Sequence, residues 1–338
     1  MNRKVRLIIV ELGLMGNSIT SVDIKFGYSC NNNCVHCVIA GHVDRLKKEN
    51  KPINRTTEEI KQHILDAKSK GANSVVFTGG EVTIRPDFLE LLEFAKSNGV
   101  LPSLQTNGRS FCVRQFAKKV IEAVPNLHFE VALHSSKKEI HDKITRVDGS
   151  YDQTVTGIKN LINLGAKTVN FKVVISRSNF KDLKDIIALA KTIKINQVDI
   201  AYPHGMGNAR KYWFDIVPKY TEIHQSVLSA ATFAKENNVY ISFEAIPFCF
   251  LEDFEKRSSE LEFIRQELKG AASELRQVGE QEINWKVERL RIKSKPIQCK
   301  KCSYFNVCEG VWCEYLELYG GNEFVPVKGK NLTLKDIL

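Results

Sequence analysis

Hydrophobic and polar residues recur along this chain with two different periods. Six short runs rich in β-branched and aromatic residues are each followed by a segment that has apolar residues at helical spacing. This alternation of strand and helix is typical of repeated βαβ units around a parallel sheet. The six predicted strands are Val22–Tyr28, Ser74–Thr78, Leu101–Gln105, His128–Leu133, Thr168–Ile175 and Gln197–Tyr202.

The segments between these strands carry the signals of helices. Thr56–Lys70 opens with Thr-Thr-Glu-Glu, Arg85–Asn98 has a proline near its start, and Asp182–Ile193 repeats apolar residues at helical spacing. A further helix is predicted over Tyr220–Asn238, followed by a short strand at Val239–Glu244. The βα alternation is therefore expected to end near residue 244.

Beyond that point the pattern changes. Residues 251–291 are rich in Glu, Lys and Arg and have apolar residues at helical spacing, and a cysteine-rich tail follows. A length of 338 residues suits one barrel-type α/β domain with a smaller appendage. We therefore expect an N-terminal segment over residues 1–21, a barrel over 22–240 and a second, C-terminal domain over 241–338.

Unusual residues gather at the carboxyl ends of the predicted strands. In parallel α/β folds these ends meet at one rim, where the connecting loops form the active site. The sequence therefore predicts a single shared site. The segments that follow the six strands are Cys30, Thr78-Gly79-Gly80-Glu81, Thr106-Asn107-Gly108, His134-Ser135, Ser176-Arg177 and Pro203-His204-Gly205.

Composition narrows the class of protein without deciding its function. Hydrophobic residues make up 43% and charged residues 26% of the chain, which is close to the globular average. No apolar run is long enough to span a bilayer and no signal-peptide cleavage site is evident, so a cytoplasmic protein is expected. The net charge of +10 is spread along the chain, which makes nucleic-acid binding a weak expectation.

Cysteine usage is more informative than charge. Seven of the nine cysteines fall into two groups with the spacing of metal ligands, which favours metal or cluster binding over disulfides. The other two stand apart. Cys112 is expected in the core, and Cys313 is expected to be a buried free thiol, an alternate ligand or a hydrogen-atom donor.

The first cysteine group follows the first predicted strand. Cys30, Cys34 and Cys37 form a C-x3-C-x2-C pattern. A four-iron cluster held by three thiolates leaves one iron open. The amino and carboxylate groups of S-adenosylmethionine (SAM) can bind that iron, which would place the sulfonium beside the cluster for one-electron reduction and carbon–sulfur cleavage. The product would be a 5′-deoxyadenosyl radical that abstracts hydrogen from a substrate.

Two other kinds of site compete with this interpretation. A structural zinc ion prefers four ligands, and His36 would have to be the fourth on a crowded loop. A redox Cys-x-x-Cys pair belongs at the start of a helix in a thioredoxin-like unit, which the flanking sequence does not fit. The open cluster is therefore the favoured interpretation.

These residues carry a family resemblance. Tyr28–Cys37 resembles the signature of the radical SAM superfamily, and Thr78–Glu81 is similar to its amino-group-binding motif. The resemblance covers about residues 22 to 205, with the two motifs in the expected order and after the expected strands. It implies an α/β fold with a partial (β/α)6 TIM-type barrel, to which a small cysteine-rich C-terminal extension is added.

The resemblance also implies a SAM pocket along the rim. The carbonyls of Gly79 and Gly80 would face the methionyl amine, beside the Glu81 carboxylate. The run after the fourth strand departs from the family's Ser-Leu-Asp pattern at Ala132 and His134, which leaves the ribose or carboxylate contact open. The residues expected to contact SAM are Gly79, Gly80, Glu81, Asn107, His134, Ser135, Arg146 and Arg177.

The second cysteine group lies in the tail. Cys299, Cys302 and Cys308 follow a C-x2-C-x5-C pattern, and Cys249 stands before the charged helical insertion, which can return the chain to the same place. These four thiolates would hold a second, auxiliary four-iron cluster. The arrangement resembles the SPASM and twitch extensions of radical SAM enzymes, and the single-cluster twitch form fits it better. A structural zinc ion on the same thiolates is the alternative.

The predicted function is a radical SAM enzyme that matures a ribosomally made peptide. The expected cofactors are SAM, the SAM-binding 4Fe–4S cluster and the auxiliary 4Fe–4S cluster, and a ferredoxin or flavodoxin would supply one electron. The alternatives are a radical SAM dehydrogenase or cyclase acting on a small molecule, and a non-catalytic iron–sulfur or zinc module that binds nucleic acid. No membrane partner is expected.

Overall fold

A computed structural model describes residues 18–338 of the chain. Of the predicted N-terminal segment, residues 1–17 lie outside this described part, and residues 18–21 begin the first strand. Within residues 18–338, no helix combines the length and the apolarity that crossing a bilayer requires.

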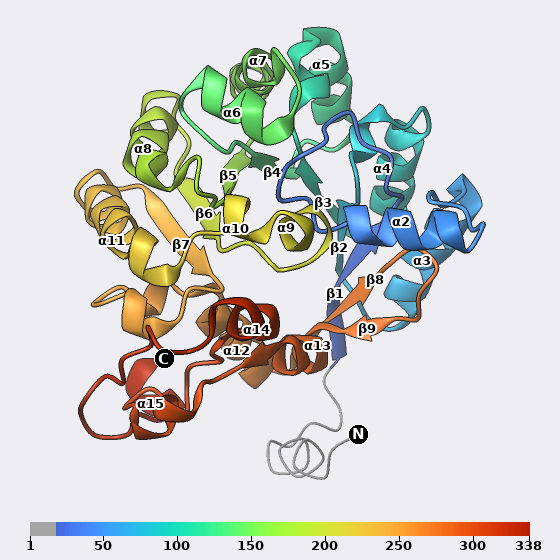
Figure 1. Cartoon of the computed structure of the whole chain (residues 1–338). Coiled ribbons are helices and arrows are strands. Elements are labelled where there is room, and N and C mark those ends of the chain that lie inside the picture. Colours follow the sequence, from blue (N-terminus) through green and yellow to red (C-terminus); the bar gives the residue numbers. More distant parts are fainter. Residues whose placement is uncertain (1–17) are drawn as a thin grey trace.

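A nine-stranded sheet forms the centre of the molecule (Figure 1). Its strand order is β7-β6-β5-β4-β3-β2-β1-β8-β9, and all neighbours are parallel except the antiparallel pair β8 and β9. The sheet therefore has two free edges and forms a partial barrel of the TIM type. The strands are β1 Ser18–Lys25, β2 Ser74–Thr78, β3 Leu101–Thr106, β4 His128–Ala132, β5 Thr168–Val174, β6 Gln197–Ala201, β7 Tyr240–Glu244, β8 Ala271–Arg276 and β9 Ile283–Asn284.

Helices surround the sheet and bury one face of every central strand. In Figure 1 the long helices form the outer ring, and α2, α9 and α10 lie in front of the carboxyl ends of the strands. Along β1, for example, Val22 and Ile24 are fully buried in the same core as Ile60 and Ile64 of α3. The helices of this part are α2 Ala40–Lys48, α3 Thr57–Ser69, α4 Phe88–Ser97, α5 Arg114–Ala123, α6 Lys138–Thr145, α7 Ser150–Asn163, α8 Leu183–Thr192, α9 Gly207–Lys211, α10 Trp213–Ile216 and α11 Tyr220–Glu236.

The structure confirms the predicted α/β alternation and adds two strands to it. Each of the six predicted strands is present, and the short seventh strand is β7. The first strand is shifted, because β1 spans Ser18–Lys25. Residues 251–291, for which the sequence indicated helical spacing, also contain β8 and β9, and β8 pairs with β1 at the other edge of the sheet. Pairing partners this distant in the chain leave no local pattern.

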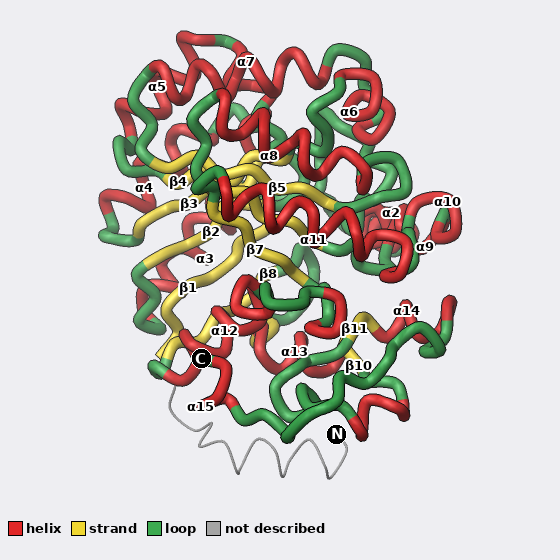
Figure 2. Tube along the Cα trace, turned by 90° about the vertical axis from the view of Figure 1, so that its left-hand side faces the viewer, coloured by secondary structure: helices red, strands yellow, loops and turns green. Residues whose placement is uncertain are grey.

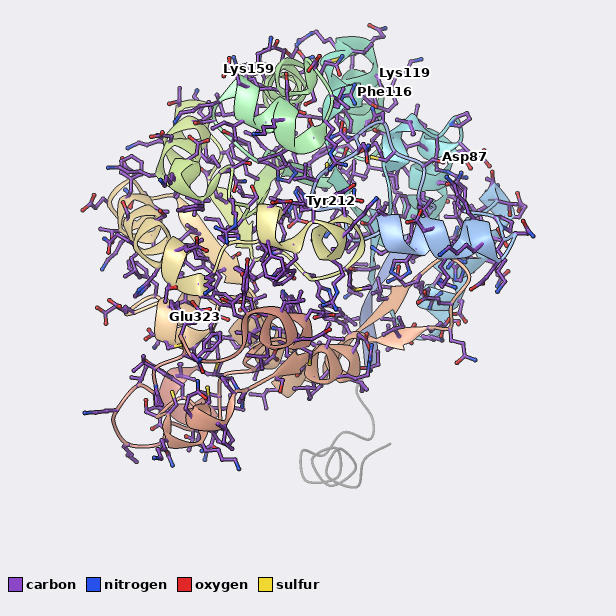
Figure 3. All side chains as sticks on the ribbon, in the orientation of Figure 1. Asp87, Phe116, Lys119, Lys159, Tyr212 and Glu323 are labelled. Carbon is purple, nitrogen blue, oxygen red and sulfur yellow. The ribbon has the colours of Figure 1, made fainter. Side chains whose placement is uncertain are left out.

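The C-terminal part packs against the open side of the barrel, where α12 contacts β7 and β8 (Figure 2). A two-stranded hairpin, β10 with β11, closes a loop that contains three of the tail cysteines. Glu323, labelled in Figure 3, accepts a hydrogen bond from the backbone N–H of Thr221 at the start of α11 at 2.9 Å. The remaining elements are α12 Ser259–Leu268, α13 Trp285–Ile292, β10 Lys293–Ser294, β11 Val311–Trp312, α14 Cys313–Tyr319 and α15 Leu334–Ile337.

A buried network of charges holds this hairpin in place. The Nζ atom of Lys293 lies 3.0 Å from the Glu309 carboxylate and also contacts the Glu260 carboxylate. Arg289 pairs with Glu309 at 2.7 Å and with Glu267 at 2.9 Å. Burial opposes ionisation of Glu260, but the neighbouring Lys293 holds its pKa below the usual value. The network ties the hairpin to α12 and α13.

Removal of one cation from this network should destabilise the folded protein, because a buried carboxylate then lacks its partner. We expect Lys293→Met to lower the free energy of unfolding by about 3–5 kcal/mol, because it leaves the buried Glu260 carboxylate without its cation and Glu309 with Arg289 alone. Chemical denaturation at neutral pH measures the loss. Lys48→Met, at an exposed position on α2, is the matched control and should change stability by less than about 0.5 kcal/mol. Equal stability of the two variants would contradict the assignment.

Candidate functional site

The first cysteine group lies on an irregular loop at the carboxyl end of β1. Cys30 is exposed, Cys34 and Cys37 are half-buried, and all three are free thiols. The loop contacts the end of α6, where the backbone N–H of Asn33 donates to the carbonyl of Thr145 at 2.9 Å. The loop has no helix or strand of its own, so such contacts decide where its thiols lie.

Two residues from other rim loops hold the same segment. Asn208, at the start of α9, donates its backbone N–H to the carbonyl of Cys37 and its side-chain amide to the carbonyl of Cys34, both at 2.9 Å. Arg109, after β3, donates to the Asn32 side chain at 2.8 Å. The sequence analysis missed both residues. Arg109 directly follows the Thr-Asn-Gly segment, which was the only motif that could have pointed to it. No motif pointed to Asn208.

The thiols of this loop are protonated in the absence of a metal. Burial raises the pKa of Cys30 to about 11, and burial likewise raises the pKa values of Cys34 and Cys37 above the usual range. Among the described residues, the three sulfur atoms do not form a set within 4.8 Å of one another. A single zinc ion at about 2.3 Å from each sulfur needs closer ligands. A cluster does not require ligands this close, because each sulfur binds a different iron.

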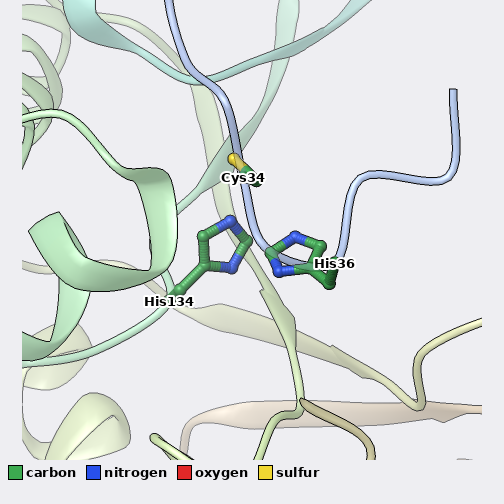
Figure 4. A group of neighbouring side chains, drawn as sticks. All are labelled: Cys34, His36 and His134. Atoms are coloured by element: carbon green, nitrogen blue, oxygen red, sulfur yellow. The ribbon is translucent and has the colours of Figure 1, made fainter. Parts of the chain in front are cut away.

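A different trio of ligand atoms does come together at this place. One atom each of Cys34, His36 and His134 lie within 4.8 Å of one another (Figure 4). The two rings meet edge to face at 4.5 Å, and Nδ1 of His36 has no hydrogen-bond partner among the described residues. Burial lowers the pKa of His36 to about 4, so its imidazole is neutral and able to bind a metal. This trio and a cluster on the three cysteines exclude one another, because both need Cys34.

The glycine pair at the end of β2 is required by close packing. A Cβ atom on Gly79 would lie 2.3 Å from the carbonyl oxygen of Gly27, and one on Gly80 would lie 2.1 Å from that of Ser29. Gly79 also has φ of 138°. The backbone that leads into the cysteine loop therefore lies directly against this pair. The two motifs that are distant in sequence form one piece of structure.

Glu81 is committed to hydrogen bonds within the protein. Its side chain is buried, and its carboxylate accepts bonds from the Thr83 backbone and hydroxyl, from the Thr106 hydroxyl at 2.8 Å and from the Asn107 backbone at 2.7 Å. These contacts join the end of β2 to the end of β3. A carboxylate that is satisfied in this way would assist SAM binding by positioning the rim, instead of by direct contact with an ammonium.

The remaining residues that were expected to contact SAM have different surroundings. Asn107 is buried and donates to the side chain of Asn31, in the cysteine loop, at 2.6 Å. The hydroxyl of Ser135 is buried and donates to Asp182. The structure thus gives Asn107 a link to the cysteine loop, while the Ser135 hydroxyl already has a partner.

The two arginines of the set contact other groups. Arg146 is exposed, and its guanidinium lies 5.4 Å from the ring centre of Tyr212, which is labelled near the middle of Figure 3. Arg177 donates to Glu222 at 2.6 Å and to the Tyr319 hydroxyl at 3.2 Å. Arg177 therefore connects the loop after β5 to the C-terminal part, and a contact with SAM has no support in these bonds.

The structure brings the tail cysteines together. Cys249 follows β7, and the thiols of Cys299, Cys302 and Cys308 are near enough to raise its pKa, after burial as the main cause. Cys308 accepts a hydrogen bond from the backbone N–H of Gly310 at 3.4 Å. Among the described residues these sulfurs also form no set within 4.8 Å, closer than which the ligands of one zinc ion would have to lie.

The two other cysteines differ in their exposure from the expectation. Cys313 is exposed at the start of α14, where the sequence favoured a buried free thiol, and its sulfur lies 3.9 Å from the carbonyl of Arg291. Cys112 is partly buried between β3 and α5. Neither residue is placed with a cysteine group by the contacts described above.

Known proteins share sequence with the barrel part of this chain. Residues 24–190 match the family model described as the radical SAM superfamily. A probable GTP 3′,8-cyclase of Saccharolobus islandicus is 30% identical over 193 residues, which are 57% of this chain and 59% of that protein. The mycofactocin maturase MftC of Mycolicibacterium smegmatis is 30% identical over 195 residues, 56% of this chain and 46% of that protein. The chain thus aligns with about half the length of these relatives.

Solved structures share the fold at low sequence identity. SuiB of Streptococcus suis, in a crystal structure with bound S-adenosylmethionine, has a TM-score of 0.61 at 16% identity and covers 96% of this chain and 80% of its own. The protein anSMEcpe with bound AdoMet has a TM-score of 0.61 at 16% identity, covering 91% of this chain and 93% of its own. Both likenesses include the C-terminal part.

By the family match, residues 24–190 belong to the radical SAM superfamily. This confirms the family that the cysteine loop and the glycine motif indicated. The cofactors expected from the sequence, SAM and a 4Fe–4S cluster, are those of this superfamily, and the three free thiols at the end of β1 fit the cluster.

The contact from Asn208 should be measurable as retention of iron. We expect Asn208→Ala to lose iron to a chelator several-fold faster than the unaltered protein after anaerobic reconstitution, because the carbonyl of Cys34 loses its donor. The free energy of unfolding should fall by no more than ~1 kcal/mol, which is the contribution of one hydrogen bond. Asn237→Ala, which removes a similar bond to Phe233 at the end of α11, should leave iron release unchanged. Equal rates in both variants would refute the role.

Proposed function

We propose that this protein is a radical SAM enzyme that modifies a peptide. The observation that carries the proposal is the loop with Cys30, Cys34 and Cys37, which is fixed to the rim of a radical SAM barrel. When bound there, the cluster and SAM supply a 5′-deoxyadenosyl radical that abstracts a hydrogen atom.

The residues of the chain bind and orient these groups. Cys30, Cys34 and Cys37 hold the cluster, and Asn208 fixes the carbonyls of the last two cysteines. Glu81 sets the ends of β2 and β3, so that the backbone of Gly79 and the side chain of Asn107 border the SAM pocket. His134, Ser135, Arg146 and Arg177 are weaker candidates for SAM contacts.

The C-terminal part of the chain favours a peptide as the substrate. Cys249, Cys299, Cys302 and Cys308 would hold an auxiliary cluster that accepts an electron or binds the substrate, as in a twitch-like extension. The likeness to SuiB, whose structures include one bound to the precursor peptide SuiA, covers 98% of this chain. MftC, a maturase, is among the sequence relatives. A ferredoxin or flavodoxin would be the electron donor.

The proposed division of the chain follows from these roles. The barrel spans residues 22–240, and the auxiliary-cluster part spans 241–338, with β8 and β9 returning to the barrel sheet. A small-molecule cyclase is the second candidate, since the matching segment is also shared with a probable GTP 3′,8-cyclase. That match does not extend over the whole of either chain.

Single cysteine variants should separate the two clusters. After anaerobic reconstitution with iron and sulfide and chemical reduction, we expect the unaltered protein to convert SAM to 5′-deoxyadenosine. Cys34→Ala should abolish this cleavage, because the SAM-binding cluster loses a ligand. Cys302→Ala should retain some uncoupled cleavage while turnover of a peptide substrate is lost. Liquid chromatography of 5′-deoxyadenosine measures cleavage in each case, and Cys112→Ala is the matched control.

Two results would contradict the proposal. One is intact SAM after reduction of fully reconstituted protein. The other is a single zinc ion that is retained in Cys30→Ala but lost in His134→Ala, since the group of Cys34, His36 and His134 would then be the native metal site. Metal analysis and iron spectroscopy distinguish the two results.

A further inference from the structure

The interior of the barrel is lined by charged side chains. On β1, Val22 and Ile24 are fully buried against the helices, so the alternate residues Asp23 and Lys25 face the inside. The charge of Asp23 interacts with Glu130 on β4 and with Glu244 on β7, which places all three across one interior. Interiors of closed barrels are usually filled by apolar side chains, whereas the interior of this partial barrel carries charged ones.

This interior is open to solvent. Gln105 is exposed although it lies on β3 in the middle of the sheet, and its neighbour Leu104 is buried on the opposite face. The side chains of Lys172 and Glu130 retain 26% and 20% of their exposure. Solvent therefore reaches the charged groups of this interior. The radical SAM fold already makes this space the site of reaction, and the charges decide which ligand it takes.

The negative charges in this space are incompletely paired. Lys172 lies 2.7 Å from the Glu244 carboxylate but 3.8 Å from that of Glu130. Among residues 18–338, the Asp23 carboxylate makes no hydrogen bond and no ion pair. The fourth acid, Asp199, is held by Gln197 at 3.0 Å. Four carboxylates thus face two lysines, an excess of two negative charges when all are ionised.

Partial burial of these carboxylates makes the excess of negative charge unfavourable. Burial raises the pKa of Asp23 to about 6, with a smaller increase from Glu130 and Glu244 that Lys25 opposes. Burial likewise raises the pKa of Glu130. A positive group between these carboxylates would offset their desolvation and provide the hydrogen-bond donors that they lack.

We propose that the substrate places a cationic group, a primary ammonium or a guanidinium such as the side chain of Lys or Arg in a peptide, between Asp23 and Glu130. This inference rests on the proposed function for its location. It disfavours a nucleoside triphosphate in the same space, because both interior lysines already face carboxylates and a polyanion would add to the negative charge.

Three matched probes test the charge preference. They are the N-acetyl, N-methylamide derivatives of lysine, norleucine and glutamate, which share one backbone and differ in the side-chain terminus. Binding is measured by calorimetry to the reconstituted full chain with SAM and without reductant, so that no turnover occurs. We expect the lysine probe to bind about tenfold more tightly than norleucine and the glutamate probe to bind weakest. GTP should not compete with the lysine probe.

Isosteric variants locate the site. Asp23→Asn and Glu130→Gln should each weaken the lysine probe about tenfold and leave the norleucine probe unchanged. Glu139→Gln, on the exposed surface of α6, is the control and should change neither. The inference is overturned if the three probes bind equally, if none of them binds, or if the glutamate probe binds most tightly. Formation of 5′-deoxyadenosine in the same preparation reports separately on the proposed function, so either proposal can fail alone.

Discussion

An irregular loop at the barrel rim is the constraint on which the rest of this structure depends. Buried backbone N–H and C=O groups need partners, and the cysteine loop has no helix or strand that supplies them. Its backbone is bonded instead by the Thr145 carbonyl at the end of α6, by Arg109 after β3 and by Asn208 at the start of α9. Four loops that are distant in sequence must therefore close together before Cys30, Cys34 and Cys37 can face one ligand.

The loop after β6 extends the same constraint to the C-terminal part. Besides its bonds to the cysteine loop, it places His204 3.4 Å from the Glu314 carboxylate and 4.3 Å from the ring centre of Trp312. Arg210, from α9, pairs with Glu317 on α14 at 2.6 Å. One short segment thus contacts the first cysteine group and the part that carries the second. A fixed relation between two clusters is what electron transfer from a substrate radical would require.

The cysteine groups and the barrel interior differ in their electrostatics. Burial raises the pKa of thiols in both cysteine groups, such as Cys30 and Cys299, so these thiols are neutral until iron binds. The barrel interior carries carboxylates that one closely paired lysine only partly stabilises. The protein therefore accepts a stability cost at the place where a ligand is expected, while the hairpin of the tail pairs its buried charges completely.

The sequence alone determined the βα alternation, the two cysteine groups and the glycine motif, because helix and strand periods and ligand spacing are local properties. Only the tertiary structure decided that β8 pairs with β1 and that Arg177 pairs with Glu222. It also decided that the Glu81 carboxylate accepts its hydrogen bonds from within the protein. Each of these depends on partners between about 25 and 250 residues apart, whose approach is set by packing of the whole barrel. The charged residues of β1, β4 and β7 are visible in the sequence, but only the curvature of the sheet brings them near one another.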